Sequence, residues 1–221
     1  MKRRAIYSII GVIVVAIISG MLLWKLMIQG DSLGQLGLVG VLIAAMLSHL
    51  TVVARDMFIP LFLPLASVYH PVILGTAAGT GAAIGEVTTY FLGWGVAEGL
   101  QELSDAEDKI AHWINKYGLW AVLLVALTPL PDTPIIILAG SRKLPFSKLA
   151  TVELVGKSAL YSVGALMGGM IYGGLENTLG TFIASLLMVV GSLVFSIVVT
   201  WKPSRDLIFG WMEKLILRMR Q

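Results

Sequence analysis

The sequence predicts an all-α membrane protein with about four transmembrane helices and two opposed, proline-broken re-entrant hairpins that form an inverted repeat. Of its 221 residues, 57% are hydrophobic and only 13% are charged, and the mean hydropathy is +0.87. Soluble domains carry charge on about a quarter of their residues, so this composition indicates an integral membrane protein. Clustered prolines interrupt two apolar runs, and one charged motif occurs twice, which favours a repeat of broken helices.

The repeated motif reads G-x4-Y-x2-G and occurs at Gly85–Gly93 and again at Gly156–Gly164. The residue after the first glycine is Glu86 in one copy and Lys157 in the other. Charges at matching positions of a membrane repeat indicate a transport pathway between two halves. We therefore predict that Glu86 and Lys157 form an ion pair across the pseudo-symmetry axis. A packing pair without a transport role is the alternative.

The first predicted element is a transmembrane helix over Ala5–Ile28. It follows three basic residues, Lys2 to Arg4, and has no clear small-x-small cleavage site, which favours an uncleaved helix with a cytoplasmic N-terminus. The chain then divides into an N-terminal helix and turn (1–36), a core with both hairpins (37–175), and a last transmembrane helix with an amphipathic tail (176–221).

Hairpin one is predicted over residues 38–67. The full charges of this stretch are Arg55 and Asp56, in the middle of an apolar run, and Pro60 and Pro64 follow directly. Proline removes a backbone donor and clashes with the preceding turn, so a straight helix is improbable. Bare backbone at membrane depth is tolerated where protein or a water-filled cavity receives it, so this hairpin should face the interior.

Hairpin two is predicted over residues 118–141 and repeats this design. Its apolar run reaches a lone aspartate, Asp132, surrounded by Pro129, Pro131 and Pro134. Three prolines within six residues again indicate a broken, re-entrant element.

Three further spanning helices are predicted over Pro71–Val96, Leu149–Leu175 and Thr178–Trp201. The segment Gln101–Tyr117 carries an apolar stripe at helical spacing, and so does the tail from Lys202, which predicts two interfacial amphipathic helices.

This order of elements places the basic segments on one side of the membrane. The N-terminus, the loop Arg142–Lys148 and the C-terminal tail all fall on the side that the positive-inside rule makes cytoplasmic. We therefore predict a multi-pass protein of the cytoplasmic membrane with both termini in the cytoplasm.

The candidate transport residues are charges held in apolar surroundings. The charges that could lie near the bilayer centre are Asp56, Glu86, Asp132, Glu153 and Lys157. Asp56 and Asp132 sit at the two broken tips, where a carboxylate in low dielectric can exchange a proton in the working pH range. The alternatives are a surface pair between Arg55 and Asp56, and an ordinary N-cap role for Asp132 at a helix starting near Thr133.

An enzyme is not predicted. His49, His70 and His112 are isolated, there is no cysteine, and no nucleophile elbow or phosphate loop is present. We therefore expect no cofactor and no metal site. A net charge of +3, located mainly at the ends and in short loops, indicates contact with membrane lipids rather than nucleic acid.

Three motifs resemble the DedA family, the prokaryotic branch of the VTT-domain (SNARE-associated) membrane proteins. They are Phe58–Pro64, Gly75–Gly93 and Thr128–Gly140, and the resemblance covers roughly Leu38 to Gly174. It implies two opposed re-entrant hairpins and transport of lipids, either flipping of polyprenyl-phosphate carriers or scrambling of phospholipids, with protons as the candidate coupling ion.

The resemblance also implies roles for particular residues. Acids near the first hairpin are functional in the family, and Asp56 is the best match, while Glu86 stands where the family often has an acid. The family commonly carries two arginines flanking the proline of its second hairpin, but here Ala126 and Asp132 occupy those places. A bound phosphate would therefore have to use other cations, namely Arg55, Lys157 or Arg142.

The sequence predicts a lipid transporter and leaves two other functions open. One is a proton- or cation-coupled transporter of a small solute, and the other is a membrane scaffold that does not transport. The predicted partners are membrane lipids and protons, and a homo-oligomer remains open.

Overall fold

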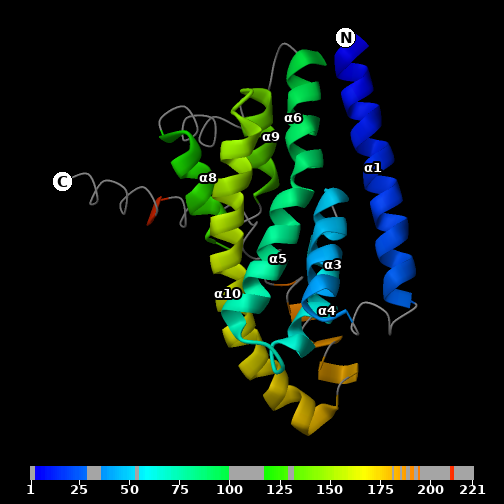
Figure 1. Ribbon diagram of the computed structural model, residues 1–221, viewed down its shortest axis with the longest axis vertical. Helices are drawn as coiled ribbons and strands as arrows, with labels where there is room; N and C mark the ends of the chain where they lie inside the picture. Colours follow the sequence, from blue (N-terminus) through cyan, green and yellow to red (C-terminus); the bar gives the residue numbers. More distant parts are fainter. Residues whose placement is uncertain are drawn as a thin grey trace, which may run out of the picture.

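The computed structural model describes residues 3–28, 36–52, 55–99, 117–128 and 132–180, together with short pieces at 182–184, 186–187, 190–191, 194 and 210–211 (Figure 1). Within these residues every regular element is a helix, as the sequence predicts. The helices are α1 (Arg3–Ile28), α3 (Leu38–Leu50), the 3-10 helix η1 (Arg55–Phe58), α4 (Ile59–Leu65), α5 (Pro71–Gly85), α6 (Val87–Gly99), α8 (Leu119–Ala126), α9 (Thr133–Ser141) and α10 (Phe146–Leu179).

Two of these helices are long and apolar enough to cross a membrane. One is α1, whose candidate span Ile6–Lys25 has a mean hydropathy of 2.6. The other is α10, with a mean hydropathy of 1.3. Large apolar side chains such as Ile17, Met21 and Met170 are exposed on both helices, and an apolar surface of this extent suits lipid rather than water. The predicted helix Thr178–Trp201, the amphipathic segment Gln101–Tyr117 and the tail from Lys202 lie largely outside the described residues.

Hairpin one is broken before its prolines. Helix α3 ends at Leu50, Val52 has a positive φ of 67°, and the chain resumes as η1 and α4. A β-branched residue with positive φ cannot continue a helix, so the break lies at this point. Pro60 falls in the first turn of α4, and Pro64 lies inside α4, one residue before its end. The predicted break is therefore confirmed, although Pro64 ends a short helix instead of starting the interruption.

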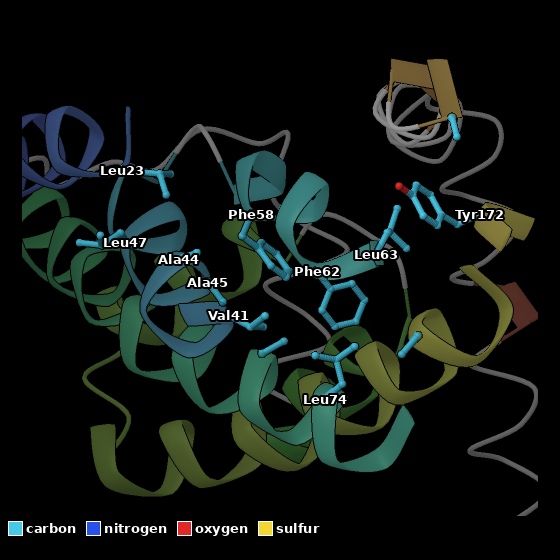
Figure 2. Packing of buried hydrophobic residues seen from close by; sticks show 13 residues of the cluster. Leu23, Val41, Ala44, Ala45, Leu47, Phe58, Phe62, Leu63, Leu74 and Tyr172 are labelled. Carbon is cyan, nitrogen blue, oxygen red and sulfur yellow. The ribbon is translucent and has the colours of Figure 1, made fainter. Parts of the chain in front are cut away.

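The two ends of hairpin one meet. A Cβ atom built on Gly37, just before α3, would lie 2.3 Å from the hydroxyl oxygen of Tyr69, just after α4. The residue before α3 is therefore packed against the side chain of the residue at the end of this segment. Residues of α1, α3, η1, α4, α5 and α10 pack into one apolar core around it (Figure 2). This core includes Leu23, Phe58, Phe62, Leu74 and Tyr172.

The predicted single helix Pro71–Val96 is two helices, α5 and α6, which meet at Glu86 in one long column (Figure 1). Helix α5 runs parallel to α3, because Gly81 faces Leu42 and Gly85 faces Met46. It runs antiparallel to α10, because Gly75 faces Ser162 and Gly79 faces Ser158. The small residues on these faces let the helix backbones approach closely.

Hairpin two begins with the same backbone conformation as hairpin one. Gly118 has φ 56° and ψ −128° before α8, and Gly37 has φ 54° and ψ −123° before α3. Both have positive φ, which glycine adopts without steric cost. Helix α9 packs antiparallel to α6, and a second apolar core, which includes Tyr90, Val122, Ile136 and Leu149, holds this half together.

The last glycine of the repeated motif gives a matched test of this packing. A Cβ atom on Gly93 would lie 1.9 Å from the carbonyl oxygen of Ile137, whereas one on Gly164 would meet nothing within 4 Å. We expect Gly93→Ala to lower the free energy of unfolding by about 1–3 kcal/mol through overpacking. Gly164→Ala should raise it by about 0.5–1 kcal/mol, the gain of alanine over glycine in a helix. Thermal unfolding in detergent measures both, and equal effects would contradict the close α6–α9 contact.

Candidate functional site

Five ionisable side chains meet between the two cores, and we call them the charge cluster. Arg55 comes from η1, Glu86 from the α5–α6 junction, Asp132 from the residue before α9, and Glu153 and Lys157 from α10. Their side chains are 14%, 1%, 12%, 0% and 3% exposed, respectively. Four separate segments therefore supply charge to one buried place.

The predicted ion pair between Glu86 and Lys157 is confirmed. The Lys157 Nζ atom lies 2.6 Å from Glu86 Oε1 and also 2.6 Å from Asp132 Oδ2. A buried ammonium group that donates to two carboxylates is strongly held, because charge-assisted hydrogen bonds are about twice as strong as neutral ones. Lys157 thus ties the α5–α6 junction to the start of α9.

Arg55 completes the network from the opposite side. Its guanidinium donates through Nη1 to Asp132 Oδ1, and through Nη2 to Glu86 Oε2 at 2.8 Å and to Thr89 Oγ1 at 3.0 Å. Glu86 and Asp132 each bridge Arg55 and Lys157, so the four groups form a closed ring. Arg55 belongs to hairpin one and Asp132 to hairpin two, so the ring joins the broken tips of both hairpins.

Glu153 is the outlying member of the charge cluster. It is fully buried, its nearest charged partner is the Lys157 ammonium at 3.8 Å, and neither of its carboxylate oxygens has a hydrogen-bond partner in the described structure. One ligand oxygen from each of Glu86, Asp132 and Glu153 lies within 4.8 Å of the others, a grouping that a small cation can use. The Lys157 ammonium contacts all three carboxylates, so a metal ion would compete with it.

The structure brings together four of the predicted site residues and leaves two outside the charge cluster. Arg55, Glu86, Asp132 and Lys157 meet, whereas Asp56 is exposed on η1 and Arg142 is exposed at the far end of α9. Pro134 lies exposed in the first turn of α9, and Pro129 and Pro131 lie outside the described residues.

Asp132 does occupy the N-cap position of α9, but its side chain makes no capping hydrogen bond. Its carboxylate oxygens accept from Arg55 and Lys157 instead. The alternative that Asp132 is an ordinary helix cap is therefore wrong.

Sequence reasoning missed Thr89 and gave Glu153 no partner, although Glu153 is one of the charges in apolar surroundings. The partner could have been found, because Glu153 lies one helical turn before Lys157, at the i, i+4 spacing that brings two side chains together. Thr89 lies inside the first motif copy, but the prediction used only the charged residue of that motif.

The motif tyrosines each contact the hairpin of the other half. Tyr161 places its hydroxyl oxygen 3.2 Å from His49 Nε2 near the tip of hairpin one, and Tyr90 donates to the carbonyl oxygen of Leu144 just after hairpin two, at 2.7 Å. His49 Nδ1 lies 2.9 Å from the carbonyl oxygen of Ala45, so this ring nitrogen donates there. In the neutral ring, Nε2 then accepts from the Tyr161 hydroxyl. These bonds hold both hairpins beside the charge cluster.

An apolar groove of about 340 Å³ lies on the outer side of the same helices. Ala83, Ile84 and Val87 line it from the column beside Glu86, and Ala150 and Leu154 line it from α10 beside Glu153. A groove of this composition accepts hydrocarbon, while the neighbouring charges lie behind its walls.

The family model described as the VTT domain matches residues 58–170, which is just over half of the chain. The matched region contains four of the five members of the charge cluster, and Arg55 lies just before it. No curated protein and no solved structure matches the chain. A domain match of this extent shows the family, and the chain therefore belongs to the VTT-domain, or DedA, family of membrane proteins.

Proposed function

We propose that this protein moves a lipid, either a phospholipid or a polyprenyl-phosphate carrier, across the cytoplasmic membrane. The observation that carries the proposal is the charge cluster, which joins the tips of two broken hairpins inside a helical bundle with an apolar exterior. Holding one charge near the centre of a bilayer costs on the order of 3 kcal/mol, and residues that bear this cost commonly mark an ion or substrate path.

The lengths of the helices on either side of Glu86 support a location of the charge cluster near the bilayer midplane. Helices α5 and α6 are 15 and 13 residues long, and Glu86 lies between them. At a rise of about 1.5 Å per residue, this column is roughly 40 Å long, enough to cross a hydrocarbon core about 30 Å thick. Glu86 then lies near the middle of the span.

We infer that the two hairpins are re-entrant and related as an inverted repeat. Three observations support this: each hairpin begins with a glycine in the same conformation, hairpin one closes at its base, and α5 and α10 run antiparallel. In transporters with inverted repeats, substrate sites lie at the repeat interface near the midplane. On this proposal the charge cluster occupies the repeat interface.

In the proposed mechanism the lipid headgroup crosses through the charge cluster while its tails remain in the apolar groove. Arg55 and Lys157 are the cations that would attract a phosphate once they separate from Glu86 and Asp132. These two carboxylates return the cations to their resting pairs after the headgroup has left. Asp56 and Arg142, both exposed, would meet the headgroup at the approaches.

The test is a translocation assay with the purified chain in lipid vesicles, using labelled phospholipid and labelled polyprenyl phosphate in separate experiments. Wild type should move at least one of them. Asp132→Asn removes the negative charge that Arg55 and Lys157 share, so this variant should lose transport by roughly tenfold or more, since charge-assisted bonds contribute about 1.5–3 kcal/mol each. Asp56→Asn, at the exposed approach, should slow transport less.

Each other outcome has a defined meaning. Full transport in Asp132→Asn that is shown to be folded would contradict the proposed path. Proton flux that depends on a small solute, with no labelled lipid moved, would identify a solute transporter. No transport of any kind by folded protein would favour the scaffold.

A further inference from the structure

The charge cluster is short of one positive charge. Arg55 and Lys157 supply two positive charges, while Glu86, Asp132 and Glu153 supply three negative ones when all are ionised. A net charge buried in low dielectric is strongly unfavourable unless it is paired or neutralised. One further cation, as small as a proton, would bring the sum to zero.

His49 does not supply the missing charge. Its Nδ1 donates to the carbonyl oxygen of Ala45. Within the described residues, the Tyr161 hydroxyl has His49 Nε2 as its hydrogen-bond partner, so its proton finds an acceptor only if Nε2 carries no hydrogen. A ring with one donating and one accepting nitrogen is neutral. The charged groups that act on Glu153 are then Arg55 from η1, Glu86 from the α5–α6 junction, Asp132 before α9, and Lys157 on α10 itself. Helices α4, α5 and α8, which also pack on α10, have no ionisable residue.

Of the three carboxylates, Glu153 is the one that gains from a proton. Each oxygen of Glu86 and each oxygen of Asp132 already receives a cationic donor. Protonating either residue would forfeit charge-assisted hydrogen bonds, whereas protonating Glu153 forfeits only a contact of 3.8 Å. Both Glu153 oxygens are buried and have no hydrogen-bond partner in the described structure.

We propose that Glu153 holds one exchangeable proton, and that release of this proton draws Lys157 away from Glu86 and Asp132. The step is balanced: the Glu153 carboxylic acid gives its proton to water and becomes a carboxylate. This carboxylate then competes for the Lys157 ammonium from one turn away on the same helix. As Lys157 turns toward Glu153, the ring that ties the two hairpin tips opens on one side. Protonation restores the ring.

This switch would control the proposed lipid transport, because opening of the ring would admit a headgroup between the hairpins. Coupling of lipid movement to the Glu153 proton rests on that proposed function, whereas the presence of the proton on Glu153 does not. The proton and the coupling are therefore tested separately.

Infrared spectroscopy of the purified full-length chain tests the proton. A protonated carboxylic acid has a C=O band well separated from carboxylate bands and sensitive to hydrogen–deuterium exchange. We expect wild type to show this band, Glu153→Gln to lose it, and Glu176→Gln, which changes an acid farther along α10 outside the charge cluster, to retain it. The band should disappear as the pH is raised while the protein stays folded.

Three results would overturn the proton on Glu153. They are the absence of the band from folded wild type at every pH, its persistence in Glu153→Gln, and its loss in Glu176→Gln. Absence of the band together with a thermal stability that rises with sodium chloride in wild type, but not in Glu153→Gln, would assign the missing charge to a bound metal cation instead.

The vesicle assay tests the coupling. Glutamine resembles the protonated acid and cannot release a proton, so Glu153→Gln should lose the pH dependence of lipid movement that wild type shows. If the variant retains the wild-type pH dependence, the coupling is refuted. If wild type moves no lipid at all, the proposed function fails and the coupling with it, while the infrared result still decides the proton.

Discussion

Lys157→Met should lower the free energy of unfolding by about 3–5 kcal/mol, the usual cost of removing one partner from a buried ion pair. The Lys157 ammonium lies 2.6 Å from both Glu86 and Asp132 and is 3% exposed. Methionine fills a similar volume, so the loss is electrostatic and not a cavity effect. Without Lys157, two or three carboxylates share the single guanidinium of Arg55. Chemical or thermal denaturation in detergent measures the change.

Two further variants separate this cost from a general effect of the substitution. Lys148→Met changes an exposed lysine in the first turn of the same helix and should alter stability by no more than about 0.5 kcal/mol. Adding Glu86→Gln to Lys157→Met removes one uncompensated carboxylate and should recover part of the loss, a non-additive result expected of residues in contact. A Lys157→Met protein as stable as wild type would show that the charge cluster does not hold the hairpins together.

The fold was predictable where local chemistry decides it. Charge-poor composition indicated the membrane, and the clustered prolines after Arg55 and around Asp132 indicated the two breaks. The junction at Glu86 was not predicted, because no proline stands there and α5 and α6 have similar compositions. A single apolar run with small residues does not show where one helix ends and the next begins.

The charge cluster was only partly predictable, for a geometric reason. The repeat placed Glu86 and Lys157 at matching positions, and this alone predicted their ion pair, which the structure contains. Arg55 and Asp56 are neighbours, and the sequence favoured the aspartate for the interior. In the 3-10 turn η1 neighbouring side chains diverge, and Arg55 points to the charge cluster while Asp56 is exposed. Which of two adjacent residues faces inward depends on tertiary contacts.

Arg55→Lys keeps the charge of the site but should lower lipid transport roughly ten- to hundredfold. Arg55 uses two nitrogens of one planar group to reach Asp132 in hairpin two, Glu86 and Thr89. Lysine is a point charge on a shorter stem, so it cannot hold these partners at once. Loss of one charge-assisted hydrogen bond costs about 1.5–3 kcal/mol, and each 1.4 kcal/mol corresponds to about a factor of ten. The vesicle assay measures the rate, and thermal unfolding shows whether the variant is folded.

The matching change at Arg142 distinguishes geometry from charge. Arg142 is exposed at the end of α9, where a lysine attracts a lipid phosphate as a point charge almost as well. Arg142→Lys should therefore keep most of the transport activity. If folded Arg55→Lys transports as fast as wild type, the planar link between the hairpin tips is not needed. A positive charge near the midplane would then suffice, and the path would depend on Arg55 in the same way as on Arg142. If Arg55→Lys alone fails, the fork that joins hairpin one to hairpin two is part of the transport machinery, because nothing else about the charge of the site has changed.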